Sequence, residues 1–319
     1  MYALPTAATI VTCQKLGVFE ALAVRSATAP ELAAALELDP AATRQLLEAV
    51  AATGHVKRKH DSFSLAKRAR RWLDPDSPTY VGSYIAHAAD YVEWWSRLEH
   101  VVRTGDHVEI HGFSPDSPHW RTYITGQFEL ARLSAPEVVK AVKLPPHSTS
   151  LLDLAGGHGL FAAELCKRHQ ELHATVLDLP GSSRVGRELL APSPAADRVS
   201  FRDGSLFDRD FGGVYDAALC FNILHHLSPD QNRELMRKLH ASLRPGGKVA
   251  ILDLFRTPLS KRPGTGDFLG LFFYLTSGAA TYTVEQLESW LLDAGFTQIR
   301  RTKLKRIPDQ LLVHATASG

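Results

Sequence analysis

Cysteine is scarce in this chain of 319 residues, and the three cysteines present form no motif. Cys13, Cys166 and Cys220 lie far apart, and no two of them make a CxxC pair. The residues around Cys166 and Cys220 are apolar, which is typical of buried thiols. A scaffold held together by disulfides is therefore excluded, and a reducing compartment is favoured.

Hydrophobic runs long enough for a membrane are also missing. The first residues, MYALPTAATIVTCQKLGVFEAL, lack the basic region and the uninterrupted apolar run of a signal peptide. No later stretch is long enough to span a bilayer. We therefore expect a cytoplasmic protein that has no membrane partner.

The chain has no strong excess of charge of either sign. Its 36 Lys and Arg residues against 34 Asp and Glu residues give a formal net charge of +2. This balance lacks the electrostatic footprint of a dedicated nucleic-acid binder. Small or neutral partners are favoured, and no nucleic-acid partner is expected.

The composition that is present is that of a globular protein with more than one domain. Hydrophobic residues make up 45% of the chain and charged residues 22%, close to the averages of globular proteins. The length exceeds a typical domain of about 100–200 residues. We predict a winged-helix-like domain over residues 1–77, a helical segment over 78–143 and an α/β domain over 144–319.

The N-terminal domain shows the pattern of a winged helix. Thr28 and Glu31 form a capping-box pattern that begins one helix, and Asp39 before Pro40 begins a second, which ends near Gly54. The segment HVKRKHDSFSL then predicts a strand, a polar turn and a second strand.

Two functions are compatible with this winged-helix pattern. A DNA-binding domain would use its basic residues for recognition, whereas a dimerisation domain would leave them as a solvated surface. We favour dimerisation, because the second half of the chain carries the motifs of an enzyme. The basic residues concerned are Lys57, Arg58, Lys59, Lys67, Arg68, Arg70 and Arg71.

Apolar runs alternate with helical patterns from Ser150 onward. This alternation predicts an α/β fold, a doubly wound parallel sheet with helices on both faces. Ligands bind at the carboxyl ends of the strands in such sheets, so the turns after the strands are where a site is expected. The segments are, in order, SLLDLAG, FAAELCKRH, HATVLDLP, VGRELLA, RVSFRDG, YDAALCFNIL, QNRELMRKLHASL and KVAILDLF.

The turn after the first of these strands is rich in glycine. In DLAGGHG, Gly156, Gly157 and Gly159 allow the main chain to turn sharply and a ligand to approach it closely. Their spacing does not match GxGxxG, so a diphosphate-binding turn is disfavoured. Asp153 stands before the glycines, where a carboxylate complements the ammonium of a methionine-like tail. Asp178 ends the second strand, where an acid accepts hydrogen bonds from ribose hydroxyls or, alternatively, caps a helix.

Six motifs occur in the order LLDLAGGHG, VLDLP, DRVSFRDGSLFD, YDAALCFNILHHLSPDQ, LRPGGKVAILD and LLDAGF. In this order they resemble the class I S-adenosylmethionine-dependent methyltransferases of the caffeate/hydroxyindole O-methyltransferase type. The resemblance covers nearly the whole chain, because that family carries an N-terminal winged-helix dimerisation domain with the same LGVFEAL opening. It implies a homodimer with S-adenosylmethionine as cofactor and S-adenosylhomocysteine as product.

The resemblance also assigns the cofactor contacts. It implies that the glycine turn wraps the methionine portion, that Asp178 binds ribose, and that Ser205 and Leu206 flank the adenine. Ser205 is a departure, because the family has an acid at this position. The expected cofactor-binding residues are Asp153, Gly156, Gly157, Gly159, Asp178, Leu179, Gly204, Ser205, Leu206 and Phe221.

The chemistry of methyl transfer requires alignment of the reactants and removal of a proton from the nucleophile. A neutral histidine suits the proton removal, since its reference pKa is about 6.5. His225 matches the family's catalytic base, and Asp253 matches an acid that hydrogen-bonds the base and sets its tautomer. The family's second acid falls at Thr281, so that part of the machinery is missing here.

The acceptor is expected to be an aromatic or polycyclic hydroxyl on a small secondary metabolite. The segment FLGLFFYLTSG and the helices before it supply aromatic surface for such a molecule. The residues expected to face the acceptor are Asn222, His226, Phe272, Thr276, Trp95 and Tyr123.

Several alternatives remain open on the sequence alone. Relatives with this architecture methylate carbon or nitrogen, or retain the cofactor for another reaction. His225 and His226 could join a third ligand to bind iron or zinc, although no HxxxH spacing occurs and we expect no metal. A different class of protein, a DNA-binding regulator that senses a ligand, would bind duplex DNA in a salt-dependent manner.

Overall fold

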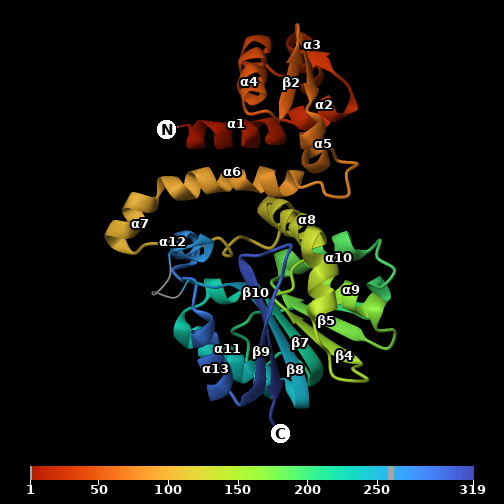
Figure 1. The fold of residues 1–319 in the computed structure, drawn as a ribbon, viewed down its shortest axis with the longest axis vertical. Coiled ribbons are helices and arrows are strands. Elements are labelled where there is room, and N and C mark those ends of the chain that lie inside the picture. Colours follow the sequence, from red (N-terminus) through yellow and green to blue (C-terminus); the bar gives the residue numbers. More distant parts are fainter. Residues whose placement is uncertain (1, 258–261) are drawn as a thin grey trace. The chain divides into compact units, whose positions relative to one another are not determined.

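The structure is a computed structural model that describes residues 2–257 and 262–319, and its contacts divide the chain into two units (Figure 1). The first unit comprises Met1–Trp95 and Thr125–Leu130, and the second comprises Ser96–Ile124 and Ala131–Gly319. The long helix α8 (Pro118–Ala141) contributes residues to both units.

The first unit is a set of helices with a small antiparallel sheet in the order β1-β3-β2. Its elements are α1 (Ala3–Lys15), α2 (Val18–Val24), β1 (Ala27–Thr28), α3 (Ala29–Leu36), α4 (Pro40–Ala52), β2 (Val56–Lys59), β3 (Ser62–Leu65), α5 (Lys67–Leu73) and most of α6 (Gly82–Ser96). In the described part of the chain, no single helix is long and apolar enough to cross a bilayer, and only α1 and α2 taken together, bent by 63°, reach that length and composition.

The helix starts predicted in this unit are confirmed. Thr28 and Glu31 form the reciprocal capping box of α3, and Asp39 Oδ1 accepts a hydrogen bond from the Ala42 N–H at 2.7 Å at the start of α4. The predicted strand pair is also confirmed as β2 and β3. Strand β1 was not predicted, because two residues are too few to show an alternating pattern.

The second unit alternates strands and helices. Its elements after α8 are β4 (Ser150–Leu154), α9 (Leu160–Arg168), β5 (His173–Asp178), α10 (Pro180–Leu190), η1 (Ala196–Arg198), β6 (Val199–Asp203), β7 (Tyr215–Phe221), η2 (Leu224–His226), α11 (Pro229–Ala241), β8 (Leu243–Leu254), α12 (Thr265–Ser277), α13 (Val284–Asp293), β9 (Phe296–Lys303) and β10 (Gln310–Ala317). The short helix α7 (Leu98–Thr104) precedes α8.

The strands of this unit form one sheet in the order β6-β5-β4-β7-β8-β10-β9. Strands β6, β5, β4, β7 and β8 are parallel, and β10 runs antiparallel between β8 and β9. The predicted doubly wound α/β fold is therefore confirmed, with α9 and α10 on one side of the sheet and α11 and α13 on the other (Figure 1). The strand order reverses between β4 and β7, which is where ligands bind in such sheets.

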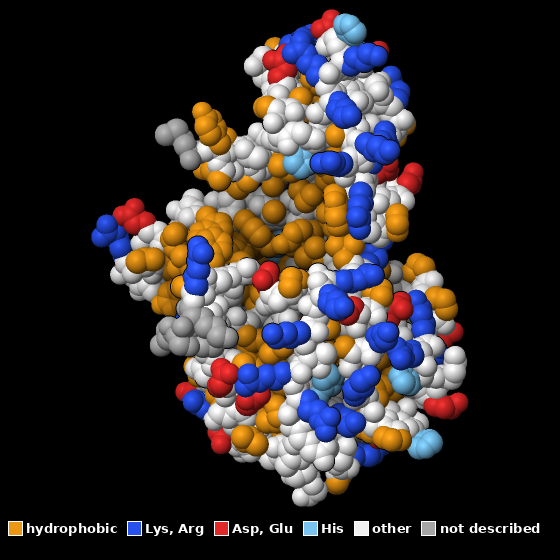
Figure 2. All heavy atoms as spheres, viewed as in Figure 1, with side chains coloured by type: hydrophobic (Ala, Val, Ile, Leu, Met, Phe, Trp, Pro, Cys, Tyr) orange, Lys and Arg blue, Asp and Glu red, His pale blue; other side chains and the backbone are white. Residues whose placement is uncertain are grey.

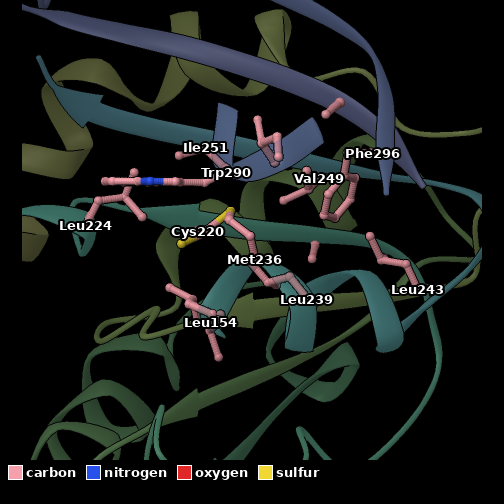
Figure 3. Close-up of a cluster of buried hydrophobic side chains, with 14 of the residues drawn as sticks. Leu154, Cys220, Leu224, Met236, Leu239, Leu243, Val249, Ile251, Trp290 and Phe296 are labelled. Atoms are coloured by element: carbon pink, nitrogen blue, oxygen red, sulfur yellow. The ribbon is translucent and has the colours of Figure 1, made fainter. Parts of the chain in front are cut away.

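The main core of the second unit lies between this sheet and α11 and α13. Figure 3 shows Met236 and Leu239 of α11 and Trp290 of α13 packed in one cluster with Val249 and Ile251 of β8. These side chains are 3% exposed or less. Burial of each side chain of this kind stabilises the fold by about 1.5–3 kcal/mol relative to exposure, so this layer holds the strand ends in place.

Asp216, near the start of β7, ties three strands together at the opposite end of the sheet from the expected site. Its Oδ2 accepts hydrogen bonds from the N–H groups of Thr149 and Ser150 at 2.8 and 3.0 Å. Its Oδ1 accepts one from the Arg244 guanidinium at 2.6 Å. Burial alone raises the pKa of this carboxyl, but the hydrogen bonds outweigh burial and lower the pKa to about 2.

We expect Asp216→Asn to lower the free energy of unfolding by about 2 kcal/mol at pH 7, because hydrogen bonds to a charged acceptor are worth about 1.5–3 kcal/mol each. The folded-state pKa lies below the ordinary value of 3.8, so the carboxylate stabilises the fold above that pH, and the stabilisation is lost as the pH falls toward 2. In urea unfolding, the difference in unfolding free energy between the wild type and Asp216→Asn should be about half as large at pH 3 as at pH 7. The same substitution at the exposed Asp309 is the control, and a difference independent of pH would contradict the assignment.

Candidate active site

The glycine turn between β4 and α9 brings the main chain against two carboxylates. Gly157 has a φ of +51°, in the left-handed region that favours glycine, and its N–H donates to Oδ2 of Asp178 at 2.7 Å. A Cβ at Gly156 would lie 2.4 Å from Cγ of Asp153, so the turn approaches this acid as only glycine can. Gly159 follows and directly precedes α9. The turn predicted from the sequence therefore connects both predicted acids.

Asp153, in β4, is a buried acid with an unpartnered oxygen. It is 1% exposed, and its Oδ2 has no hydrogen-bond partner. Burial, and then the charge of Asp178, raises the pKa of Asp153 to about 7. An unpaired buried carboxylate is costly unless a cationic group meets it. The ammonium group predicted at this position fits that oxygen.

Asp178 is the last residue of β5 and faces the same turn. Besides the Gly157 contact, its Oδ1 accepts a hydrogen bond from the Leu179 N–H at 2.7 Å. Burial raises the pKa of this carboxyl, and the two N–H groups oppose the rise. Each oxygen keeps acceptor capacity for a hydroxyl, as ribose binding requires. Helix α10 begins at Pro180 without a side-chain cap, so Asp178 does not serve as its cap.

The turn after β6 contains a carboxylate that the sequence analysis did not identify. The Ser205 N–H donates to Oδ2 of Asp208 at 2.8 Å, and the Ser205 hydroxyl accepts from the Phe207 N–H at 3.1 Å. The Gly204 N–H donates to the carbonyl oxygen of Asp178 at 2.9 Å. Asp208 thus supplies an acid at the turn where the family's acid is replaced by Ser205.

Apolar side chains flank these polar groups. Leu179 packs with Trp120 and Tyr123, and Phe221, 8% exposed at the end of β7, meets Phe161 edge to face with ring centroids 5.2 Å apart. The half-buried Leu206 packs against the main core. These surfaces can enclose the flat part of a nucleoside.

His225 and Asp253 are two catalytic candidates that form a buried, hydrogen-bonded pair. His225 Nδ1 lies 2.5 Å from Oδ1 of Asp253, and the two side chains are 7% and 0% exposed. The N–H groups of Leu224 and Leu254 donate to Oδ2 and Oδ1 of Asp253 at 2.9 and 2.7 Å. Phe273 stacks on the imidazole with centroids 3.8 Å apart. The histidine is therefore fixed by a carboxylate on one edge and by an aromatic ring on one face.

His226 lies in a different environment. Its Nδ1 is 2.7 Å from the hydroxyl of Ser277, and its ring meets His111 edge to face at 4.6 Å. Burial, and then the neighbouring His225 and His111, holds the pKa of His226 well below its usual value. Burial likewise lowers the pKa of His111 to about 4. Both rings are neutral at pH 7, so the surroundings of His225 contain neutral imidazoles.

The other residues expected to face the acceptor are placed as follows. Asn222, with φ +55°, follows β7, and its Oδ1 accepts from Gln310 Nε2 at 2.8 Å. Thr276 is fully buried, and its hydroxyl donates to the Phe272 carbonyl within α12. The hydroxyl oxygen of Tyr123 lies 3.5 Å from Nε2 of His111. Phe272 is 9% exposed in α12, and Trp95 belongs to the first unit.

Thr281 stands where the resemblance expects a second acid. It is 2% exposed, and its hydroxyl donates to the Gly266 carbonyl at 2.8 Å. The threonine therefore fastens the start of α12 and does not reach His225 through any hydrogen bond in the described residues. Asp253 is the carboxylate that holds this histidine.

The alternative of iron or zinc at His225 and His226 would need a third ligand. The Nδ1 atoms of the two rings are engaged by Asp253 and Ser277. Over residues 2–257 and 262–319, these two histidines do not belong to any group of three side chains that could hold a metal ion.

Sequence reasoning missed Asp208, His111 and Ser277, and it expected aromatic surface from Phe273 without predicting that this ring stacks on His225. Asp208 lies three residues beyond the motif position, and His111 lies in a segment without helical or strand periodicity. Phe273 and Ser277 were part of a segment expected to line the site, but nothing in the sequence indicated which ring would stack on His225. The contacts of His111, Phe273 and Ser277 with the two histidines join residues far apart in the chain.

Two family models match the chain. The O-methyltransferase domain matches residues 95–297, and the O-methyltransferase dimerisation domain matches residues 3–75. The chain is 28% identical over 306 residues to a 3-hydroxy-5-methyl-1-naphthoate 3-O-methyltransferase of Streptomyces sahachiroi, covering 92% of this chain and 87% of that protein. It is 29% identical over 314 residues to the tetracenomycin polyketide synthesis 8-O-methyl transferase TcmO of Streptomyces glaucescens, covering 95% and 91%.

The fold has matching solved structures. Human N-acetylserotonin methyltransferase, solved in complex with S-adenosylmethionine, superposes with a TM-score of 0.86 at 17% identity, covering 100% of this chain and 95% of that one. At this identity the likeness establishes the fold.

We expect Asp253→Asn to change the tautomer of His225. In Asp253→Asn one of the two acceptor oxygens becomes an NH₂ group, and an NH₂ that faces Nδ1 donates to the ring and favours a proton on Nε2. Two-dimensional ¹⁵N–¹H NMR of histidine-labelled protein should show the Nδ1–H form in the wild type and its loss in the variant. Ser277→Ala is the control, since it should move the signals of His226 and leave the tautomer of His225; an unchanged spectrum in Asp253→Asn would refute the assignment.

Proposed function

The chain belongs to the O-methyltransferase family, and from that membership we propose that it transfers a methyl group from S-adenosylmethionine to a hydroxyl of an aromatic or polycyclic small molecule, with His225 as the general base. The observation that carries this proposal is the contact between His225 and Asp253, beside the strand ends that bear the glycine turn. The relatives named above act, by their names, on a naphthoate and on a tetracenomycin polyketide.

The cofactor requirement follows from the residues of the glycine turn. Asp153 offers an unpartnered oxygen for the ammonium, Asp178 offers acceptors for ribose, and the turn after β6 offers Asp208 in addition to Ser205. When bound there, S-adenosylmethionine supplies a methyl group already activated by a sulfonium. The chain's remaining tasks are then to align the acceptor and to remove its proton.

Proton removal falls to Nε2 of His225. An ionised carboxylate only accepts hydrogen bonds, so the contact with Asp253 places the ring proton on Nδ1 and leaves the lone pair on Nε2. Asp253 also stabilises the imidazolium that forms when the acceptor hydroxyl loses its proton. The stacked Phe273 prevents the ring from tilting away. This arrangement uses one carboxylate and does not need an acid at Thr281.

The remaining site residues are proposed to shape the acceptor pocket. Neutral His226 and His111 offer hydrogen bonds without charge, which suits a neutral aromatic acceptor. Tyr123 and Phe272 offer aromatic surface. Asn222, Thr276 and Trp95 stay predictions for this pocket.

The assembly is proposed to be a cytoplasmic homodimer. The match to the dimerisation domain over residues 3–75 supports the dimer. Some of the basic residues weighed earlier for DNA binding are engaged within the first unit: Arg58 lies 3.5 Å from Glu48, and Arg70 lies 2.9 Å from Asp74. These pairs support the dimerisation function over DNA recognition.

We expect His225→Gln to lower kcat by about 10²–10⁴-fold, the contribution typical of a general base. The measurement is transfer of labelled methyl from S-adenosylmethionine to a panel of naphthols, phenols and matching amines. Affinity for S-adenosylhomocysteine should change little, because the cofactor contacts are left intact. The exposed His169→Gln is the matched control. If His225→Gln methylates hydroxyls as fast as the wild type, His225 is not the general base. If the wild type methylates only amines, the acceptor group is an amine and not a hydroxyl.

We expect cofactor affinity to weaken as the pH falls from 8 to 6. The pKa of Asp153 is about 7, and an ammonium binds the ionised carboxyl, whose fraction falls about tenfold over this range. Calorimetry with S-adenosylhomocysteine should therefore show about a tenfold rise in Kd and proton release on binding near pH 6. In Asp153→Asn the affinity should be weaker and nearly independent of pH over this range. A wild-type Kd that does not change with pH would rule out this role.

A further inference from the structure

A depression outside the site described above lies on the face of the sheet formed by β8, β9 and β10, beside the C-terminal end of α8. Its volume is about 690 Å³. The side chains that concern its chemistry are Lys140, Lys143, Lys248, Arg300, Lys303 and His314, and we call it the basic depression. Figure 2 shows Lys and Arg side chains gathered on the second unit over these strands.

The cations of the basic depression are not neutralised by the protein. In the residues that the structure describes, none of the four lysines and Arg300 forms an ion pair. The lining contains one carboxylate, Glu137, whose oxygens accept hydrogen bonds from the N–H groups of Lys305 and Arg306 at 2.7 Å each. Other arginines of this unit, such as Arg301 with Glu288, are paired. The excess positive charge here therefore has no partner in the unit.

His314 adds a buried donor to this depression. It is 8% exposed, and its Nε2 is buried without a hydrogen-bond partner. Its position in β10 lies directly opposite Arg300 in β9 and Ala250 in β8, so these residues share one face of the sheet. Burial, and then Lys248 and Lys143, lowers the pKa of His314 to about 4, so the ring is neutral at pH 7. A buried nitrogen without a hydrogen-bond partner is unfavourable, and a ligand oxygen would satisfy it.

The basic depression is separate from the catalytic residues. Lys248 precedes Asp253 by five residues in β8, which corresponds to roughly 16 Å along a strand. An odd separation also places the two side chains on opposite faces of the sheet. A ligand in the basic depression would therefore not occupy the cofactor or acceptor site.

We propose that the basic depression binds a small polyanion that carries two or more phosphate groups. Its volume falls in the range of about 300–1,000 Å³ that is usual for small-ligand sites. Phosphate oxygens pair with lysine and arginine in strong charge-assisted hydrogen bonds. Unpaired cations from β8, β9 and the C-terminal end of α8 line one depression together with the unmet His314 nitrogen of β10, which suits several anionic oxygens on one compact molecule.

The test is calorimetry on the full-length protein with inorganic tripolyphosphate and, as a second probe, ATP, both at 50 and 200 mM NaCl. Binding of one tripolyphosphate per chain, weaker at the higher salt, is expected. Equal affinities would assign recognition to the phosphate chain, and tighter binding of ATP would assign a phosphorylated organic molecule. Saturation with S-adenosylhomocysteine should leave the affinity unchanged; competition would place the anion in the cofactor site and overturn the proposal.

The double variant Lys143→Ala/Lys248→Ala should raise the Kd for tripolyphosphate about tenfold or more, the loss expected from one or two charge-assisted hydrogen bonds. Lys57→Ala/Lys59→Ala, on the exposed strand β2 of the first unit, removes the same charge and should change it less than twofold. His314→Phe should also weaken binding, because it keeps the ring but removes the donor. Equal losses in both lysine pairs, no heat with tripolyphosphate, or binding of polyglutamate alone, which would indicate an acidic protein partner, would each overturn the proposal.

Discussion

The site depends on one constraint: carboxylates buried near the ends of strands must find partners in place of water. Asp153, Asp178 and Asp253 each lie within the last two residues of a strand of the sheet. A buried charge is costly unless hydrogen bonds or an opposite charge compensate it. Asp253 accepts hydrogen bonds from two backbone N–H groups and contacts His225, and Asp178 accepts hydrogen bonds from two backbone N–H groups. Of these three acids only Asp153 keeps an unpartnered buried oxygen, and burial raises its pKa to about 7. Each acid therefore has an environment that fits the role proposed for it.

The surroundings of His225 follow from the same constraint. Phe273, His226 and His111 are packed around it as uncharged rings, so Asp253 is the charge that acts on the imidazole through a direct contact. Neutral neighbours do not compete for the ring proton, and they leave the histidine free of a second carboxylate that would hold it protonated. The hydroxyl of Thr281 donates a hydrogen bond to the start of α12, which is consistent with a mechanism that uses one acid.

The second unit separates its charges between two parts of one sheet. Acids occupy the carboxyl ends of β4, β5 and β8, where they can bind cationic and hydroxyl groups of a ligand. Cations occupy the face of β8, β9 and β10 farther back along the strands. Because strand alternation places Lys248 and Asp253 on opposite faces, the same strand can serve both regions without the two charges neutralising each other.

The sequence by itself determined the elements and the strand-end residues, because these depend on local patterns. Capping signals at Thr28 and Asp39, the alternation of strands and helices, and acids directly after apolar runs can be read within a few residues of one another. The family followed from the order of its motifs. Only the tertiary structure decided the partners: Asp208 at the turn that lacks the family's acid, Phe273 on His225, and the cations that gather near His314. The contact of Phe273 with His225 and the gathering of cations near His314 join segments distant in sequence, and their geometry is set by how strands align and helices pack, which no local pattern encodes.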